Sequence, residues 1–197
     1  MSPTIILASS SNIRAELLKN AHINFNVEAP NIDESITKQA LSNQSPTSIA
    51  IKLACEKALA VCKRHSQPHP LVIGADQVCV FNQSILNKPL THANTINQLT
   101  RLSGHTHQLI SAIAIAQHDQ ILFKSTDTAT LTMKPLTSSD IETYVNLDQP
   151  YHSCGGYYIE KNGHDLFESI DGTLDTIQGL PIKSLLNALN PLLAANK

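Results

Sequence analysis

The strongest constraint on the fold is a nearly continuous apolar run over residues 71–81 that contains a single carboxylate. An apolar stretch of this length is typical of a strand buried on both faces of a sheet. The run is broken by Gly74, Asp76 and Gln77. Because a carboxylate is costly to bury without a partner, Asp76 is predicted to be a metal ligand, a general base, or one half of a structural ion pair with a nearby Lys or Arg.

The rest of the chain alternates between strand and helix patterns. Strands are predicted over 4–7, 23–28, 108–116 and 121–133, and helices over 13–20, 47–63, 93–102, 138–145 and 181–193. The polar segment 29–45 contains Pro30 and is predicted to be a loop with at most one helical turn. Hairpin turns are expected at 82–84 and 118–119. The pattern indicates an α/β or α+β protein with one mixed sheet, flanking helices and a cleft, in a single domain over 1–197.

Composition argues against several functional classes. The net charge is −2, and no cluster of Lys and Arg is present to follow a nucleic-acid backbone. No apolar run reaches the roughly 18 residues that span a bilayer, and the N-terminus lacks the basic region of a signal peptide. The four cysteines have no metal-binding spacing, so free thiols in a cytoplasmic protein are expected.

The turn after the first strand could hold a small anion. Ser9, Ser10 and Ser11 precede a predicted helix, and Arg14 lies in its first turn. Backbone N–H groups at a helix N-terminus attract anions, but a Ser-rich turn also caps helices, and capping by Ser11 is the competing interpretation. The two common Gly-rich phosphate loops are absent from the sequence.

Four further charged residues stand out less. The Asp33-Glu34 pair lies in the polar loop, and Lys57 falls on a helical pattern. Lys88 precedes Pro89, which restricts its backbone to an extended conformation and so fixes the direction of the side chain. Taken alone, each of these residues is an ordinary solvated surface group.

Seven blocks of sequence, taken in order, resemble the Maf family of nucleotide pyrophosphatases. The blocks are 6–18, 31–34, 53–58, 74–77, 87–89, 102–108 and, at the end, 155–157 with 177–181. The resemblance extends over residues 4–190, and seven ordered matches are far more specific than any one of them.

The resemblance implies a Maf/Ham1 (ITPase-like) fold with two lobes around a central cleft, usually in a homodimer. It implies hydrolysis of the α–β phosphoanhydride of a nucleoside triphosphate to monophosphate and pyrophosphate, which keeps such nucleotides out of nucleic acids. Neither a nucleic acid nor a membrane is expected as a partner. The family is also linked to arrest of cell division, so a nucleotide-binding regulator of septum formation is the alternative function.

The resemblance also implies roles for individual residues. The catalytic residues would be Asp76, Glu34 and Lys88; Glu34 and Asp76 would hold Mg²⁺ or Mn²⁺; and the substrate would be bound by Ser9, Ser11, Arg14, Lys57, Gln77 and Glu160. Carboxylate and phosphate oxygens are the ligands these cations prefer.

Two positions bear on the base. Family members that act on dTTP and UTP typically carry Thr and Gln where this chain has Gln77 and Glu160. A Glu side chain only accepts hydrogen bonds, which suits the N1–H and N2 amino edge of guanine. The sequence is therefore most similar to the branch that acts on 7-methyl-GTP, although Asn12-Ile13 stands where that branch usually has Pro-Trp. A dTTP or UTP pyrophosphatase is the alternative.

Overall fold

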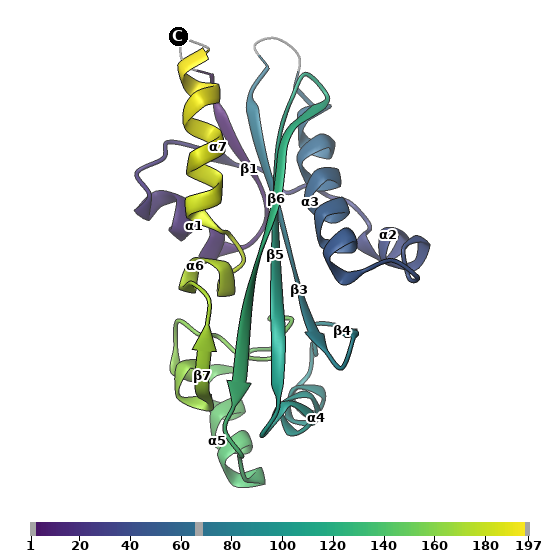
Figure 1. Ribbon diagram of the computed structural model, residues 1–197, viewed down its shortest axis with the longest axis vertical. Helices are drawn as coiled ribbons and strands as arrows, with labels where there is room; N and C mark the ends of the chain where they lie inside the picture. The colour runs from purple at the N-terminus through teal and green to yellow at the C-terminus, as the bar shows by residue number, and fades with distance from the viewer. Residues whose placement is uncertain (1–2, 66–68, 196–197) are drawn as a thin grey trace. The chain divides into compact units, whose positions relative to one another are not determined.

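The computed structural model describes residues 3–65 and 69–195, which form one mixed sheet with flanking helices (Figure 1). The strands are β1 (Ile5–Ala8), β2 (Asn26–Val27), β3 (Leu71–Phe81), β4 (Ser84–Leu86), β5 (Thr106–Gln117), β6 (Gln120–Met133) and β7 (Phe167–Asp171). The helices are α1 (Asn12–Asn20), α2 (Glu34–Ala40), α3 (Pro46–Cys62), α4 (His92–Leu102), α5 (Ser138–Asp148), α6 (Leu174–Ile177) and α7 (Ile182–Ala195), with a 3-10 helix η1 (Asn162–Leu166).

The sheet mixes parallel and antiparallel pairs. Its strand order is β2-β1-β3-β5-β6-β7, and β4 pairs with β3. Strand β1 is parallel to β2 and β3, whereas β4 is antiparallel to β3 and β7 is antiparallel to β6. In the β1–β3 register Ala8 lies opposite Gly74, so β1 ends two residues before the level of Asp76.

The chain divides into two compact units that share the three long strands. The first comprises the described residues of 1–76, 111–127 and 179–197, and the second comprises 77–110 and 128–178. The boundary on β3 therefore falls between Asp76 and Gln77.

Each unit has its own apolar core. In the first unit the core joins β1, β3 and β5 to the apolar sides of α1 and α7, and Figure 1 shows α3 on the other side of these strands. Its fully or nearly buried members are Ile5, Leu7, Leu18, Leu71, Ile73, Ala75, Ile113, Ile115, Leu180, Leu185 and Leu189. In the second unit α4 and α5 contact each other, and the core gathers residues from Cys79 to Ile177.

Local sequence signals explain where most elements begin and turn. The side chain of Ser11 accepts a hydrogen bond from the Arg14 backbone and caps α1, and Thr137 and Asp140 cap α5 reciprocally. The two-residue turns Asn82-Gln83 and His118-Asp119 have positive φ at both positions, the conformation that matches the twist of a β-hairpin. Both hairpin predictions are confirmed.

Several elements differ from the sequence-based prediction, which also lacks β4, α6 and η1. Segment 29–45 contains α2, a helix of seven residues, because Asp33 caps it through the Ser35 backbone N–H. The strand expected over 23–28 shrinks to two residues because Ile23 and Phe25 pack against the core of the first unit and leave the ladder. Strand β7 was not predicted at all, since only Phe167 among its five residues is buried.

Candidate functional site

Asp76 lies on β3 with only 5% of its surface exposed, as the apolar run predicted. Its Oδ1 is 2.6 Å from Nζ of Lys57, which is 7% exposed on α3. The predicted ion pair with a nearby Lys is therefore confirmed. An ion pair does not exclude chemistry at Asp76, because charged groups that are buried together are frequent at functional sites.

A second carboxylate holds the same ammonium. Glu34 is the first residue of α2, and its Oε1 is 2.7 Å from Lys57 Nζ. The other Glu34 oxygen is 3.5 Å from Nζ of Lys38 on the next turn. Lys57 thus bridges Glu34 and Asp76, which are 42 residues apart in the chain (76 − 34).

Close packing of α3 against β3 brings Lys57 to Asp76. A Cβ at Gly74 would overlap the Ala54 carbonyl oxygen and lie 2.7 Å from the Ala58 backbone nitrogen. Residues 74 and 76 face the same side of the strand, because side chains alternate along it. Glycine at 74 therefore allows the helix to approach closely enough for Lys57 to reach Asp76.

Arg14 is fixed by two backbone carbonyls. Its Nε donates to Gly179 O at 2.9 Å, and its Nη1 donates to Ala75 O at 2.8 Å. The second bond ties the guanidinium to the residue immediately before Asp76. Arg14 is thus anchored to the backbone of β3 one residue before Asp76, and sequence reasoning missed Gly179 as its other anchor.

The serine turn is organised as a cap. The Ser11 backbone N–H donates to Ser9 Oγ at 3.1 Å, and Ser11 Oγ accepts from the Arg14 N–H at 3.5 Å. Ser9 is buried. The capping interpretation of Ser11 is confirmed, while binding of an anion by these two hydroxyls stays a prediction.

In the second unit, the side chain of Gln77 is held by protein groups. Its Nε2 donates to Thr176 O at 3.0 Å and to Ile177 O at 2.8 Å. Its Oε1 accepts a bond from Cys154 Sγ at 3.4 Å. Sequence reasoning missed Cys154, because a single cysteine in a turn carries no pattern.

Lys88 is exposed, but the chain after it is fixed on both sides. The Asn94 side chain donates to Pro89 O at 3.0 Å, and Leu90 N donates to Tyr151 O at 2.9 Å. Leu90 has φ 64°, a left-handed conformation that a branched residue rarely adopts. These contacts fix the residues that follow Lys88, and the restricted backbone expected at Lys88 itself stays a prediction.

Glu160 is exposed on a turn that is firmly braced. The backbone N–H groups of Lys161 and Gly163 both donate to Tyr158 O, at 3.2 and 3.1 Å. The Tyr158 N–H in turn donates to Tyr144 Oη at 2.9 Å. The turn thus presents the Glu160 carboxylate from a well-defined backbone.

The chemistry of the donors fits a divalent metal that also binds phosphate. Glu34 and Asp76 offer hard carboxylate oxygens, and Mg²⁺ is usually held by one or two carboxylates together with phosphates and water. Within residues 3–65 and 69–195, no group of three or more His, Cys, Asp and Glu side chains could hold a metal by itself. The two carboxylates therefore suit a cation that arrives with a phosphate ligand.

Comparison with known families decides where the chain belongs. Residues 4–192 match the family model described as "Maf-like protein". The chain belongs to the Maf-like family. This confirms the resemblance that the seven sequence blocks indicated.

Relatives of this Maf-like chain carry names that describe an activity. A protein named nucleoside triphosphate pyrophosphatase from Legionella pneumophila (strain Paris) is 40% identical over 185 residues, covering 94% of this chain and 92% of its own. One with the same name from Rhodopseudomonas palustris (strain BisB18) is 44% identical, covering 95% and 93%. A 7-methyl-GTP pyrophosphatase from Rhizobium johnstonii (strain DSM 114642 / LMG 32736 / 3841) is 39% identical, covering 98% of each.

The fold of the Maf-like chain also resembles a solved structure. A HAM1 protein from Coxiella burnetii superposes with a TM-score of 0.52 at 13% identity, covering 96% of this chain and 99% of that one. At this identity the likeness shows the fold alone. It confirms the Ham1-like mixed sheet with flanking helices.

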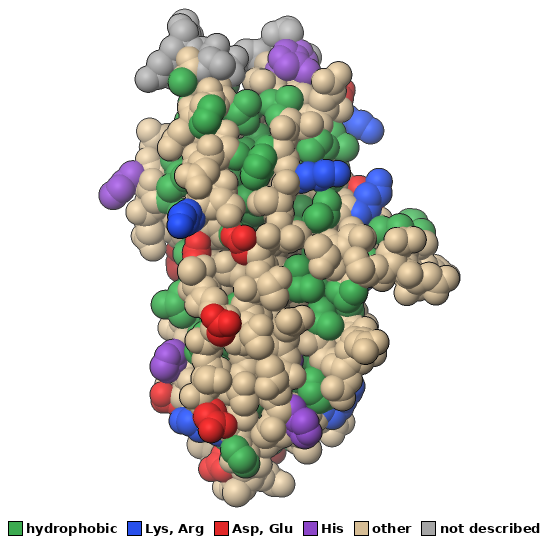
Figure 2. All heavy atoms as spheres, in the orientation of Figure 1, with side chains coloured by type: hydrophobic (Ala, Val, Ile, Leu, Met, Phe, Trp, Pro, Cys, Tyr) green, Lys and Arg blue, Asp and Glu red, His purple; other side chains and the backbone are tan. Residues whose placement is uncertain are grey.

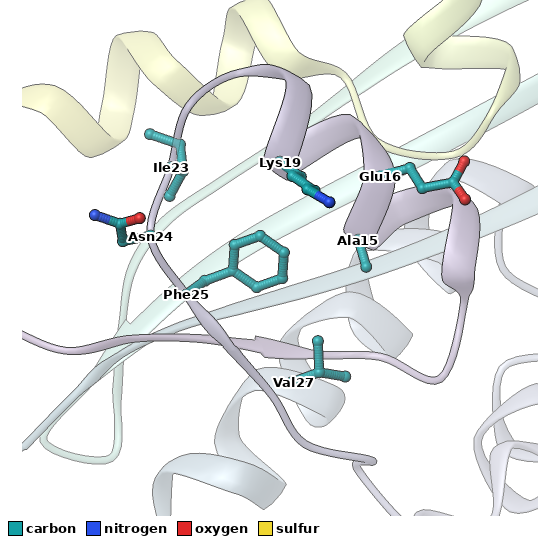
Figure 3. Close-up of a pocket in the computed structure, with 7 residues that line it drawn as sticks. All are labelled: Ala15, Glu16, Lys19, Ile23, Asn24, Phe25 and Val27. Atoms are coloured by element: carbon teal, nitrogen blue, oxygen red, sulfur yellow. The ribbon is translucent and has the colours of Figure 1, made fainter.

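A surface hollow elsewhere on the first unit of the Maf-like chain contains none of these residues. It has a volume of about 450 Å³, and Figure 3 shows the Phe25 ring directed toward α1. Its lining residues are Ala15, Glu16, Lys19, Ile23, Asn24, Phe25 and Val27. The lining offers one carboxylate and one ammonium, and the structure shows nothing that would make it a phosphate site.

The charged surface of the Maf-like chain is mixed. On the face shown in Figure 2, the coloured Lys and Arg side chains are interspersed with acidic ones and form no continuous basic band. Absence of nucleic-acid binding stays a prediction. Every helix among the described residues is too short or too polar to cross a membrane.

Proposed function

We propose that this chain hydrolyses nucleoside triphosphates to nucleoside monophosphate and pyrophosphate. The observation that carries the proposal is the Lys57 ammonium held between the Glu34 and Asp76 carboxylates. The Arg14 guanidinium is bound to the residue next to Asp76. This hydrolysis needs cations that bind a polyanion and, beside them, carboxylates that accept a proton. The names of the Legionella and Rhodopseudomonas relatives support the same activity.

In the proposed reaction a water oxygen forms a bond to the α-phosphorus, and the α–β bridging oxygen leaves on pyrophosphate. Asp76 accepts a proton from the water. Lys57, which is buried, and Arg14, which is partly buried, stabilise the negative charge that develops on the leaving group, because cations already in place once the substrate is bound need no reorganisation as the reaction proceeds. Ser9 and Ser11 donate to phosphate oxygens at the start of α1. The role of Lys88 as a further cation rests on the sequence.

A divalent cation, Mg²⁺ or Mn²⁺, is proposed to accompany the substrate. Glu34 and Asp76 would hold it, since their carboxylates supply the oxygens it prefers. When bound, it polarises a phosphoryl oxygen as a Lewis acid.

The proposed substrate is 7-methyl-GTP. Glu160 accepts hydrogen bonds from the guanine N1–H and N2 amino groups, and the braced turn fixes its backbone. The Rhizobium relative carries the name of this activity. For Gln77 we favour a role in fixing the backbone beside Asp76, because its amide is held by Thr176, Ile177 and Cys154. UTP and dTTP are the competing substrates.

The proposed cellular role is to keep such nucleotides out of nucleic acids. A cytoplasmic location is supported by the four cysteines, which are all free thiols. A homodimer is proposed from the family resemblance. The alternative, a nucleotide-binding regulator of cell division, is disfavoured by the carboxylates at Lys57, because a protein that only binds a polyanion gains nothing from acidic groups beside it.

Product analysis tests the proposal. The chain is incubated with Mg²⁺ or Mn²⁺ and each of UTP, dTTP, CTP, GTP and 7-methyl-GTP, beside the variants Asp76→Asn and Asp165→Asn. The Asn side chain keeps an acceptor for Lys57, whereas Asp165 is an exposed control. We expect wild type and Asp165→Asn to form monophosphate and pyrophosphate in equal amounts, and Asp76→Asn to form neither. Nucleotide binding without turnover of any member would overturn the proposal in favour of the regulator.

A further inference from the structure

The ammonium of Lys57 contacts the same two carboxylates that are proposed to hold the metal. Its Nζ lies 2.6 Å from Asp76 Oδ1 and 2.7 Å from Glu34 Oε1, and the residue is 7% exposed. Contacts this short to both carboxylates make Lys57 the counter-ion of the pair. A metal that uses these oxygens has to displace the ammonium.

We propose that Lys57 makes metal binding conditional on the nucleotide: it excludes free divalent cations from Glu34 and Asp76 until a triphosphate draws its ammonium away. The metal therefore enters with the nucleotide and not before it. This inference rests on the proposed function, since it assigns Glu34 and Asp76 to the metal and Lys57 to the phosphates.

The electrostatics of a buried site support this order. A divalent cation bound beside the Lys57 ammonium is repelled, and water screens this repulsion least on the side of Asp76, which is buried, whereas the Glu34 side chain is 36% exposed. An ammonium pushed away from both carboxylates would be left as an unpaired buried charge, which is costly. A triphosphate removes both penalties, since its oxygens replace the carboxylates as partners of Lys57 and also bind the metal.

The chemistry of lysine allows such an exchange. Lys carries a compact charge on a flexible stem with four carbons, so the ammonium reaches alternative partners by rotating side-chain bonds. The stem of Lys57 begins on α3, where its neighbours Ala54 and Ala58 are fully buried. Arg14 is different, because two backbone carbonyls fix its planar guanidinium.

Mn²⁺ binding measured by electron paramagnetic resonance tests the proposal without turnover. The proteins compared are wild type, Lys57→Met and Lys38→Met, each alone and with the α,β-methylene analogues of GTP and UTP. Lys38 is the matched control, because it also contacts Glu34 but is only half-buried, and its Nζ lies 3.5 Å from Glu34 Oε2.

We expect wild type to bind Mn²⁺ weakly alone and at least about tenfold more tightly with an analogue, a coupling that is reciprocal between metal and nucleotide. Lys57→Met should bind Mn²⁺ about tenfold more tightly than wild type without nucleotide and show less coupling, whereas Lys38→Met should match wild type. Lys57→Met with no gain in Mn²⁺ affinity, or wild type binding Mn²⁺ equally with and without analogue, would overturn the proposal.

A second measurement follows the wild-type protein, in which the buried charge of Lys57 is kept. The ¹H–¹⁵N signal of the Lys57 ammonium, assigned with Lys57→Arg, is followed in wild type as Mg²⁺ is added. We expect the signal to stay in place with Mg²⁺ alone and to move when an analogue is added; movement with Mg²⁺ alone contradicts the proposal. A chain that behaves as expected here but releases no pyrophosphate contradicts the proposed reaction and not this inference.

Discussion

The guanidinium of Arg14 covers the face of Gly179. A Cβ at position 179 would lie 3.0 Å from Nη2 and 3.1 Å from Nε of Arg14, and the same glycine accepts the Nε hydrogen bond through its carbonyl. Gly179 has φ +91°, a conformation that other residues adopt only under strain. The residue that anchors Arg14 is therefore also one that has to lack a side chain.

Gly179→Ala is expected to displace Arg14 and, under the proposed function, to lower kcat/KM about 10- to 100-fold, because small misplacements of a charge-stabilising group are costly. Backbone strain should add about 1–2 kcal/mol of destabilisation. Steady-state kinetics and urea unfolding measure the two effects. Gly104→Ala is the control, because it also has positive φ (+71°) but its Cβ would meet nothing closer than 4.0 Å. Equal activity of the two variants would contradict this reasoning.

His107 is expected to make the fold sensitive to acid. Its Nε2 lies 2.7 Å from Tyr157 Oη, its Nδ1 has no hydrogen-bond partner, and burial lowers its pKa to about 4 from 6.5. The unfolded chain therefore binds the proton more tightly than the folded chain. The free energy of unfolding has its full value above pH 6.5 and falls by about 3 kcal/mol in all as the pH drops toward 4.

Urea unfolding at pH 7 and pH 4.5 measures this loss. Between these two pH values, the free energy of unfolding of His107→Gln should fall by about 2–3 kcal/mol less than that of wild type, since Gln does not titrate. The exposed His105 provides the matched variant His105→Gln, which should behave as wild type. The same pH dependence in wild type and His107→Gln would show that the buried imidazole is not responsible.

Replacing the neutral amide of Gln77 with a charged group is expected to destabilise the protein. Gln77→Glu at neutral pH would place carboxylate oxygens against the carbonyls of Thr176 and Ile177 and should cost about 2–4 kcal/mol of stability. Cys154→Ser keeps a donor toward Gln77 Oε1 and should cost less than about 1 kcal/mol. Urea denaturation of both variants checks the contrast, and equal losses would count against it.

Gly74→Ala should damage the first unit. The added Cβ would overlap the Ala54 carbonyl, and neither backbone can yield without separating α3 from β3. We expect a loss of about 3 kcal/mol or more, seen as a fall in Tm of about 6–12 °C. Calorimetry measures it. A Tm within about 2 °C of wild type would mean that the helix approaches the strand less closely than described.

The central strand could be predicted from the sequence with both its ends, because the apolar run over 71–81 ends at a two-residue turn with its own signal. Helix α2 could not. Asp33 and Glu34 are equally common as solvated loop residues, and only the long-range contact with Lys57 shows that Glu34 faces inward.

The candidate site, too, could be predicted from the sequence only in part. Asp76 stands out because a carboxylate is anomalous in an apolar strand, and an ion pair with a Lys or Arg is one of the alternatives that the sequence leaves open. The choice of Lys57 depends on how closely α3 packs on β3, a tertiary property that no local pattern encodes. The contact of Cys154 with Gln77 was likewise invisible, since it joins residues 77 positions apart.

Asp76 and Gln77 follow each other on one extended strand, so their side chains leave it on opposite faces. One residue is tied to the ammonium of α3, and the other to carbonyls at the end of α6. Replacements at 77 therefore remove no charge from the ion cluster, while a neutral residue at 76 removes one of its two carboxylates. A lineage built on this strand can therefore change the two neighbouring positions separately: position 76 answers to the ammonium of α3, and position 77 answers to the carbonyls of α6.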